Sequence, residues 1–425
     1  MLNKPPRSII KIKTEWQERA DRRISTILLS EAGKAEQTLF YEFTGSLLPS
    51  KPKTDDFALL ALLPYAMGRG ADLHINGTVT TEQIERFEEQ QDAWTRWHPN
   101  LFQKISLTAD REIASSPPAS NSAVLSFSGG IDATFALYAH KRKWIGRRSR
   151  DVISAVMIHG YEIRPDNDAD FQVAHRRGLE VCDALGVGLT AARTNWREFQ
   201  HSWRQAFIFG IAAALNQFSA TVSRGVIATD EPYEGEILGY GNNSITNQMM
   251  GNSSFPLEFT GAGYGRTQKA QLLKNEDVVL RNIRVCSRPE AGGKNCGECK
   301  KCIRSKLNFL AARAQNMPAL GRPFAMTDLQ KLDFNDPLHL SFYREMLAYG
   351  DWSEHREIEE AIRNALDQAG SQHNQIMVPA RRTNPVKWIA SQLYCIANRL
   401  KCLGLLKHRS IVDKSDHDKM PFPDS

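Results

Sequence analysis

The chain has 425 residues, 41% of them hydrophobic and 24% charged, which is typical of a folded globular protein and sufficient for two or three domains. No run approaches the roughly 18 apolar residues of a membrane-spanning helix, and the first residues, M-L-N-K-P-P-R-S, lack the apolar core of an export signal. The net charge of +6 suits a protein that binds small anions and is too evenly spread to indicate nucleic-acid binding. We therefore expect a cytoplasmic protein without a membrane span.

The first 120 residues predict an α+β domain without a catalytic constellation. Four elements are predicted: strands at 38–43 and 73–79, a buried helix at 57–67 and an amphipathic helix at 81–97. Thr80 or Thr81 is the expected N-cap of the last helix. The run S-S-P-P-A-S-N-S at 115–122 is rich in turn formers and predicts a domain boundary. We expect this domain, 1–120, to be structural or to dock a partner.

A glycine turn follows the boundary. Val124, Leu125 and Phe127 form the apolar run of a buried strand. The small residues Ser128-Gly129-Gly130 then make a turn, and helical spacing begins near Thr134. Such a turn gathers unpaired backbone N–H groups at the positive end of a helix dipole, where phosphate is the usual ligand. An ordinary strand–turn–helix corner is the alternative.

The pattern beyond this turn alternates between strand and helix. Strands are predicted at 152–158, 189–194 and 225–229, and helices at 171–185 and 203–218. This alternation predicts an α/β fold with a parallel sheet covered by helices on both faces. Ligands of such sheets bind beyond the carboxyl ends of the strands, where the glycine turn, His159 and Asp230 all fall.

Two features follow the last of these strands. Residues 230–254 are rich in Gly, Asn and Ser and predict a long loop, either a lid over the site or an unconstrained surface loop. Beyond it, Arg266 and Lys269 stand three residues apart near the start of a predicted helix. Two cations there oppose the helix dipole unless an anion lies between them, so they are either anion ligands or part of a solvated face.

Four of the seven cysteines form the pattern C-x9-C-G-E-C-K-K-C, at Cys286, Cys296, Cys299 and Cys302. Thiolates two residues apart can converge on one metal, Gly297 allows the tight turn, and four thiolates complete a tetrahedral Zn²⁺ site. We expect structural zinc in a reducing compartment, with an iron–sulfur cluster or a thiol-based sulfur carrier as alternatives. Cys182, Cys395 and Cys402 lie on apolar segments and are expected to be core residues.

The glycine turn resembles the S-G-G-x-D-[ST] signature of the PP-loop ATP pyrophosphatases. Ser128, Gly129, Gly130 and Asp132 match, as does the downstream Thr134. The chain departs from the signature at Ala133, where the family usually has a hydroxyl residue. The resemblance implies a PP-loop core that splits ATP between its α- and β-phosphates and adenylates a substrate.

The order of motifs from Val124 to Leu310 resembles the 7-cyano-7-deazaguanine synthase (QueC) family: a PP-loop, an R-x-x-K helix, the four cysteines and then Arg304. That family adenylates 7-carboxy-7-deazaguanine, forms the amide with ammonia and converts the amide to the nitrile with a second ATP. Of the family's D-Y-x-x-Y-P-D-C-R stretch, this chain matches only the first residue, at Asp230, while Tyr233 corresponds only approximately. The long extensions on both sides are similar to those of the QueC-like proteins of bacterial antiphage clusters.

The resemblance assigns roles to individual residues. It implies catalytic roles for Asp132, Arg266 and Lys269, and zinc binding by the four clustered cysteines. Nucleotide binding, with Mg²⁺, is implied for Ser126, Ser128, Gly129, Gly130, Ile131, Asp132, Thr134, His159 and Asp230. The expected ligands are therefore ATP, Mg²⁺, Zn²⁺ and a deazaguanine, with a protein partner or protein substrate from the same defence system.

The complete prediction comprises three domains: the α+β domain, a QueC-like PP-loop domain at 121–318 and a helical extension at 319–425. The extension contains a basic amphipathic helix at 388–406, expected to pack on the domain or a partner or to bind a membrane surface, and a disordered tail. The predicted activity is adenylation of a deazaguanine carboxylate followed by amide formation with an amine, such as a partner's N-terminus. Three alternatives remain: 7-cyano-7-deazaguanine synthase itself, an RNA-thiolating PP-loop enzyme, and a catalytically degenerate scaffold.

Overall fold

The computed structural model describes residues 7–200 and 202–377. The chain divides into two compact units, Met1–Leu366 and Asp367–Ser425, and the sheet and the candidate site described below lie in the first. Among the helices of the described residues, none has the length and apolarity needed to cross a bilayer. The predicted helix at 388–406, with Cys395 and Cys402, lies outside the described residues.

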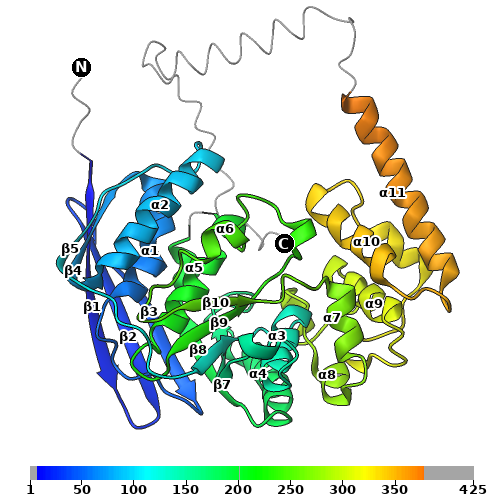
Figure 1. Ribbon diagram of the computed structural model, residues 1–425, viewed down its shortest axis with the longest axis horizontal. Coiled ribbons are helices and arrows are strands. Elements are labelled where there is room, and N and C mark those ends of the chain that lie inside the picture. Colours follow the sequence, from blue (N-terminus) through cyan, green and yellow to red (C-terminus); the bar gives the residue numbers. More distant parts are fainter. Residues whose placement is uncertain (1–6, 201, 378–425) are drawn as a thin grey trace, which may run out of the picture. The chain divides into compact units, whose positions relative to one another are not determined.

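One sheet of ten strands forms the centre of the first unit, in the order β10-β9-β6-β7-β8-β3-β2-β1-β4-β5 (Figure 1). The strands are β1 (Ile9–Glu18), β2 (Arg22–Glu31), β3 (Gln37–Gly45), β4 (Asp72–Thr80), β5 (Leu107–Ile113), β6 (Ser122–Ser126), β7 (Asp151–His159), β8 (Gly188–Thr194), β9 (Arg224–Ala228) and β10 (Leu257–Thr260). The helices are α1 (Asp56–Arg69), α2 (Thr81–Trp97), α3 (Ile131–Lys141), α4 (Asp168–Asp183), α5 (Trp203–Asn216), α6 (Ser244–Asn247), α7 (Arg266–Leu273), α8 (Asp277–Asn282), α9 (Lys300–Ala311), α10 (Pro337–Tyr349) and α11 (Arg356–Met377). The fold is therefore α/β, as predicted, with a mostly parallel sheet.

The half of the sheet made by β6 to β10 is parallel throughout. Its strands are largely apolar because successive side chains are buried on opposite faces. Leu125 and Val226 belong to the core beneath α3 and α4, whereas their neighbours Val124 and Ile227 belong to the core shared with α1 and α5. Helices thus cover both faces of this half, as the alternation of elements predicts.

The half made by β1 to β5 has a different pattern. β1 pairs antiparallel with β2, and β2 with β3, while β4 and β5 continue beside β1 in parallel. Burial alternates along β1, where Ile10 and Ile12 are buried and Lys11 and Lys13 are exposed. One face of this half therefore packs on the apolar core with α1 and α2, and the other carries polar and partly buried side chains.

The two halves meet where β3 pairs antiparallel with β8, with Tyr41 opposite Thr194 and Phe43 opposite Ala192. Strands from before and after residue 120 therefore share one sheet and one apolar core. The division into domains at residues 120 and 318 stays a prediction.

Local sequence signals locate several elements closely. The amphipathic helix predicted at 81–97 is α2, and its N-cap is Thr80, whose Oγ1 accepts a hydrogen bond from Gln83 N at 3.3 Å. The buried helix predicted at 57–67 is α1. β1 and β2 were not predicted, although the alternation of apolar and charged residues along β1 is itself the pattern of a strand with one buried face.

Candidate functional site

The predicted glycine turn joins β6 to α3. Gly129 has φ of +79°, a left-handed conformation that favours glycine, and Gly130 is the N-cap of α3. No side chain caps the first turn of α3. Its amino end therefore has the strand–turn–helix geometry in which backbone N–H groups can receive an anion.

Asp132 lies beside Arg266 and Lys269 at this helix end, although more than 130 residues separate it from either of them. Asp132 receives hydrogen bonds from Arg266 Nε at 3.0 Å and from Lys269 Nζ at 2.7 Å. The buried Lys269 ammonium also donates to the carbonyl of Thr229 at 2.8 Å. Burial alone would raise the pKa of Asp132, but the two cations outweigh it and hold that pKa below its ordinary value. The anion expected between the two cations is thus provided by Asp132 itself.

Two further carboxyl groups follow β9, at Asp230 and Glu231. Asp230 accepts hydrogen bonds from Asn242 Nδ2 at 3.0 Å and from the hydroxyl of Tyr240 at 3.2 Å. Burial, and then the nearby charge of Asp132, raise the pKa of Asp230. Glu231 is buried, and burial raises its pKa to about 8 despite the attraction of Arg266. At neutral pH Glu231 therefore holds its proton, and Asp132 is the carboxylate that pairs with both Arg266 and Lys269.

The loop after β9 is attached to the N-terminal part of the chain. Asn252 Nδ2 donates to the buried carboxylate of Asp56 at 3.0 Å, and Gln83 Nε2 donates to the carbonyl of Met249 at 3.1 Å. Nearer the site, the ring of His98 at the end of α2 hydrogen-bonds the carbonyl of Gly239 at 2.7 Å. The predicted long loop is therefore anchored along its length by α1, α2 and the residue that ends α2.

Helix α10 of the C-terminal extension supports the cationic helix α7. The carboxylate of Glu345 accepts from Thr267 N at 3.1 Å and from the Thr267 hydroxyl at 2.8 Å. A Cβ at Gly265 would lie 2.2 Å from Glu345 Oε1, so the contact requires glycine there. One turn earlier on α10, the ring of Phe342 lies 4.4 Å from the Arg266 guanidinium carbon. Both contacts fix the first turn of α7 and hence the position of Arg266.

A second chain segment fixes the glycine turn. The backbone N–H of Arg284 donates to the carbonyl of Gly129 at 2.9 Å, and the guanidinium of Arg284 pairs with Glu162 at 3.1 Å. Glu162 also pairs with Lys301 in the first turn of α9, at 3.0 Å. Burial would raise the pKa of Glu162, but Lys301 and Arg284 hold it below its ordinary value. The turn is therefore linked through residue 284 to the segment that carries the cysteines.

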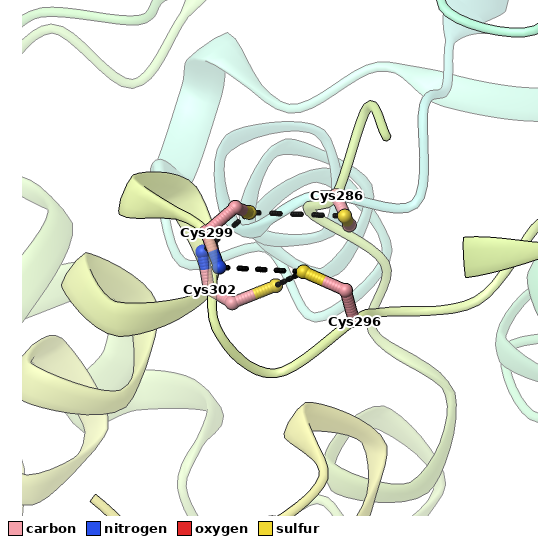
Figure 2. Close-up of side chains that lie close together, drawn as sticks. All are labelled: Cys286, Cys296, Cys299 and Cys302. Atoms are coloured by element: carbon pink, nitrogen blue, oxygen red, sulfur yellow. Dashed lines mark hydrogen bonds between the residues drawn. The ribbon is translucent and has the colours of Figure 1, made fainter. Parts of the chain in front are cut away.

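The four predicted metal ligands converge, and Figure 2 shows their sulfur atoms facing one another. All four Sγ atoms lie within 4.8 Å of one another, with Cys286 and Cys299 at 3.7 Å and Cys296 and Cys302 at 4.0 Å. Zinc bonded to four sulfurs at about 2.3 Å separates them by about 3.8 Å, so the spacing fits a tetrahedral ion. The cluster can therefore hold a metal such as zinc.

The backbone around the cysteines suits thiolate ligands. Cys296 Sγ accepts from the N–H of Glu298 at 3.4 Å and of Cys299 at 3.3 Å, while Cys299 is itself the N-cap of α9. Gly297, with φ of +76°, makes the tight turn, and its carbonyl accepts from Lys306 Nζ at 2.6 Å. N–H groups directed at sulfur stabilise the negative charge of a metal-bound thiolate.

The remaining predicted residues lie around this edge of the sheet. Ser126 ends β6, Ile131 and Thr134 are buried on α3, and His159 ends β7. The His159 ring stacks on Phe171 at 4.2 Å and hydrogen-bonds the carbonyl of Arg164 at 2.7 Å. Burial lowers the pKa of His159 and favours its neutral form.

Comparison with protein-family models, curated proteins and solved structures returned no match to this chain.

Reasoning from the sequence missed several residues of this site. Glu231, Arg284, Phe342 and Glu345 had no distinguishing local pattern. The only signal for Glu231 is its position directly after Asp230 at the end of a predicted strand. Glu345 and Phe342 lie on an amphipathic helix and are indistinguishable there from ordinary surface and core residues.

Proposed function

We propose that this protein uses ATP to adenylate the carboxylate of a 7-carboxy-7-deazaguanine-type molecule and then transfers the acyl group to an amine, forming an amide. The observation that carries the proposal is the junction of an uncapped glycine turn at the start of α3 with Asp132, Arg266 and Lys269. Backbone N–H groups and two cations at one point suit a polyphosphate. The choice of a deazaguanine rests on the resemblance in sequence.

The residues of the site have distinct roles in this reaction. The turn from Ser128 to Ile131 holds the phosphates, and Arg266 and Lys269 offset the charge of the leaving pyrophosphate. Asp132 keeps the two cations in position before the nucleotide binds. The carboxylates of Asp132 and Asp230 would hold Mg²⁺, which supplies charge neutralisation at the phosphate oxygens.

The chemistry requires no protein nucleophile. The substrate carboxylate attacks the α-phosphorus, a new O–P bond forms, and the bond to the β-phosphate oxygen breaks with release of pyrophosphate. A neutral amine then attacks the acyl carbon, AMP leaves with the bonding electrons, and the amine loses a proton. Catalysis is therefore mainly positioning and charge stabilisation.

An amine on another protein, such as an N-terminus, is the proposed acceptor, and antiphage defence is the proposed setting. The loop after Asp230 lacks most of the family's D-Y-x-x-Y-P-D-C-R stretch and supports a different acceptor from that of the synthases. A zinc ion held by the four thiolates is proposed as structural, because a Cys₄ site leaves no open position for substrate. The backbone N–H of Arg284 donates a hydrogen bond to the carbonyl of Gly129. This contact gives the zinc ion an indirect role in holding the glycine turn.

The test is to incubate the purified chain with ATP, Mg²⁺, 7-carboxy-7-deazaguanine and candidate amines, and to measure AMP and product masses. Asp132→Asn should reduce AMP release at least a hundredfold at unchanged fold, because the two cations lose their anchor. Asp92→Asn is the matched control, since Asp92 is exposed and, within residues 7–200 and 202–377, forms its ion pair with Lys104 alone. Substrate-independent AMP release, or none at all, would overturn the proposal in favour of another activity or a scaffold.

Two outcomes separate the remaining enzymatic alternatives. A free nitrile as the product would identify a 7-cyano-7-deazaguanine synthase. RNA thiolation requires a reactive cysteine outside the cluster, but within the described residues Cys182 is buried and its pKa is raised by burial to about 12. Iron in place of zinc in the purified protein would favour thiolation.

A further inference from the structure

The guanidinium group of Arg304 has no counter-charge in contact with it within the part of the chain that the structure describes. Among residues 7–200 and 202–377 it forms no ion pair, and its terminal nitrogen Nη1 is buried without a hydrogen-bond partner. The residue as a whole is partly exposed, so a ligand can still reach the group. Because buried charged groups are normally paired, an arginine in this state indicates a place that an anion fills.

One aromatic ring places Arg304 beside the site. The guanidinium carbon of Arg304 lies 5.0 Å from the ring centre of Phe342, and that of Arg266 lies 4.4 Å from the same centre. Phe342 is buried on α10, whereas Arg304 lies on α9 and Arg266 begins α7. Three helices therefore bring two guanidinium groups against one buried ring.

Both arginines keep donors that none of the described residues uses. Arg266 reaches Asp132 through Nε, at 3.0 Å, and within the described ranges its two terminal nitrogens donate no hydrogen bond, although the side chain is partly exposed. Two like charges at one ring repel each other unless an anion lies between them. Planar guanidinium groups bind the oxygens of carboxylates and phosphates through paired N–H bonds. The two arginines together thus suit an anionic group with several oxygens.

We propose that Arg266 and Arg304, held on Phe342, form a clamp for one anionic group of the reactants, either a phosphate of the nucleotide or the carboxylate that is activated. Both groups present the negatively charged oxygens that paired guanidinium donors bind. The inference rests on the proposed function for the identity of the reactants. It adds Arg304 to the binding residues, makes Phe342 a positioning residue and gives α10 a part in the site.

Titration calorimetry measures the binding of each reactant by itself, so the result does not depend on turnover. The probes are α,β-methylene-ATP with Mg²⁺, which cannot be split between its α- and β-phosphates, and 7-carboxy-7-deazaguanine. Arg304→Met removes the charge and the donors, so it should weaken the binding of at least one probe tenfold or more. Weaker binding of the ATP analogue assigns the clamp to a phosphate, and weaker binding of the acid assigns it to the carboxylate.

Three further variants sharpen the measurement. Arg304→Lys keeps the charge but loses the planar pair of donors, so its affinity for the affected probe should lie between those of Arg304→Met and the wild type. Phe342→Leu removes the ring that supports the clamp and should weaken the same probe at least threefold. Arg344→Met, an exposed change on α10, is the matched control and should bind both probes as the wild type does.

A purely structural role for Arg304 gives a different result. Arg304 follows Cys302 by two residues, and a charge that only offset the cluster's thiolates would be needed for zinc binding and stability. Arg304→Met would then lose zinc and unfold at a lower temperature, which overturns the clamp. The clamp predicts unchanged zinc and, without ligand, an unchanged or higher unfolding temperature, because the variant removes a charge that no described residue balances.

The remaining outcomes separate the clamp from the adenylation chemistry. If Arg304→Met weakens a probe but the wild type releases no AMP, the clamp stands and the adenylation is wrong. If the wild type releases AMP and Arg304→Met binds both probes as tightly, the adenylation stands and the clamp is wrong. Failure of the wild type to bind either probe would overturn the inference. If Arg304→Met does not fold, Arg304→Lys replaces it, with a loss of at least threefold expected.

Discussion

The two halves of the ten-stranded sheet differ in what lies at the ends of their strands. In the half from β6 to β10, helices bury both faces, and β6 and β9 end directly at the glycine turn and at Asp230. In the half from β1 to β5, one face stays polar or only partly buried, and no sequence-predicted site residue lies there. The first arrangement is typical of ligand-binding parallel sheets, and the second of mixed sheets with one solvent-exposed face.

The comparison also shows how the N-terminal half contributes to the site. It supplies Asp56 and Gln83, which hold Asn252 and Met249 of the loop that begins at Asp230. A half without candidate catalytic groups therefore determines the shape of the loop beside them. Four experiments test whether the half from β6 to β10 carries the candidate catalytic groups while the half from β1 to β5 supports the loop.

The largest effect is expected at the cysteine cluster, which anchors the site half. Cys299→Ser removes a metal ligand, so bound zinc should fall below half an equivalent and the free energy of unfolding by on the order of 5 kcal/mol. Metal analysis and denaturant unfolding measure both quantities. Cys182→Ala is the matched control and should keep its zinc, because Cys182 lies outside the cluster. A fully loaded, equally stable Cys299→Ser variant would contradict the assignment.

The next effect concerns the buried carboxyl group of Glu231. Its pKa is raised from 4.5 to about 8 by burial, so between these values the folded state keeps a proton that the unfolded state releases. Stability of the wild type should therefore fall as pH rises from about 5 to 8. Since one pKa unit corresponds to about 1.4 kcal/mol, Glu231→Gln should gain roughly 2–4 kcal/mol relative to the wild type over that range.

Urea unfolding at a series of pH values measures this difference. Glu234→Gln should follow the wild type at every pH because its carboxyl group is exposed. A stability difference between Glu231→Gln and the wild type that does not change with pH would show that Glu231 is already ionised in the folded protein.

A smaller effect is expected where the N-terminal half holds the loop. Asn252→Ala leaves the buried Asp56 carboxylate without one of its donors and should cost about 1–3 kcal/mol of stability. If the N-terminal half determines the shape of the loop, AMP release with the deazaguanine should also fall while ATP affinity is retained. Glu234→Gln, an exposed change in the same loop, is the control. Full activity of a less stable Asn252→Ala variant would limit the role of this contact to stability.

The last comparison, which includes the smallest expected effect, sets a strand buried on both faces against a strand with one exposed face. Ala155 in β7 is fully buried, so Ala155→Leu should overpack the core and cost about 1–3 kcal/mol. Lys13 lies on the exposed face of β1, and Lys13→Ala should change stability by less than about 0.5 kcal/mol. If Lys13→Ala lowers the free energy of unfolding by much more than this, the exposed face of β1 is covered in the folded protein.

The sequence predicted the parallel half of the sheet well because each element there has a strong local signal. The apolar runs of β6, β7 and β9, the glycine turn and the cysteine spacing are all visible within a few residues of chain. Residues that meet through tertiary packing were harder to find. Glu345 contacts Thr267, 78 residues away, and Arg284 contacts Gly129, more than 150 residues away. No periodicity in the sequence predicts either contact.

The antiparallel joint between β3 and β8 also affects how the chain can fold during its synthesis. β3 ends at Gly45, but its outer neighbour begins only at Gly188. A nascent chain that has not yet reached β8 carries an unpaired edge on β3, and such edges invite pairing with other chains. The β3 edge of the N-terminal half therefore stays unpaired during synthesis until β8 has been made.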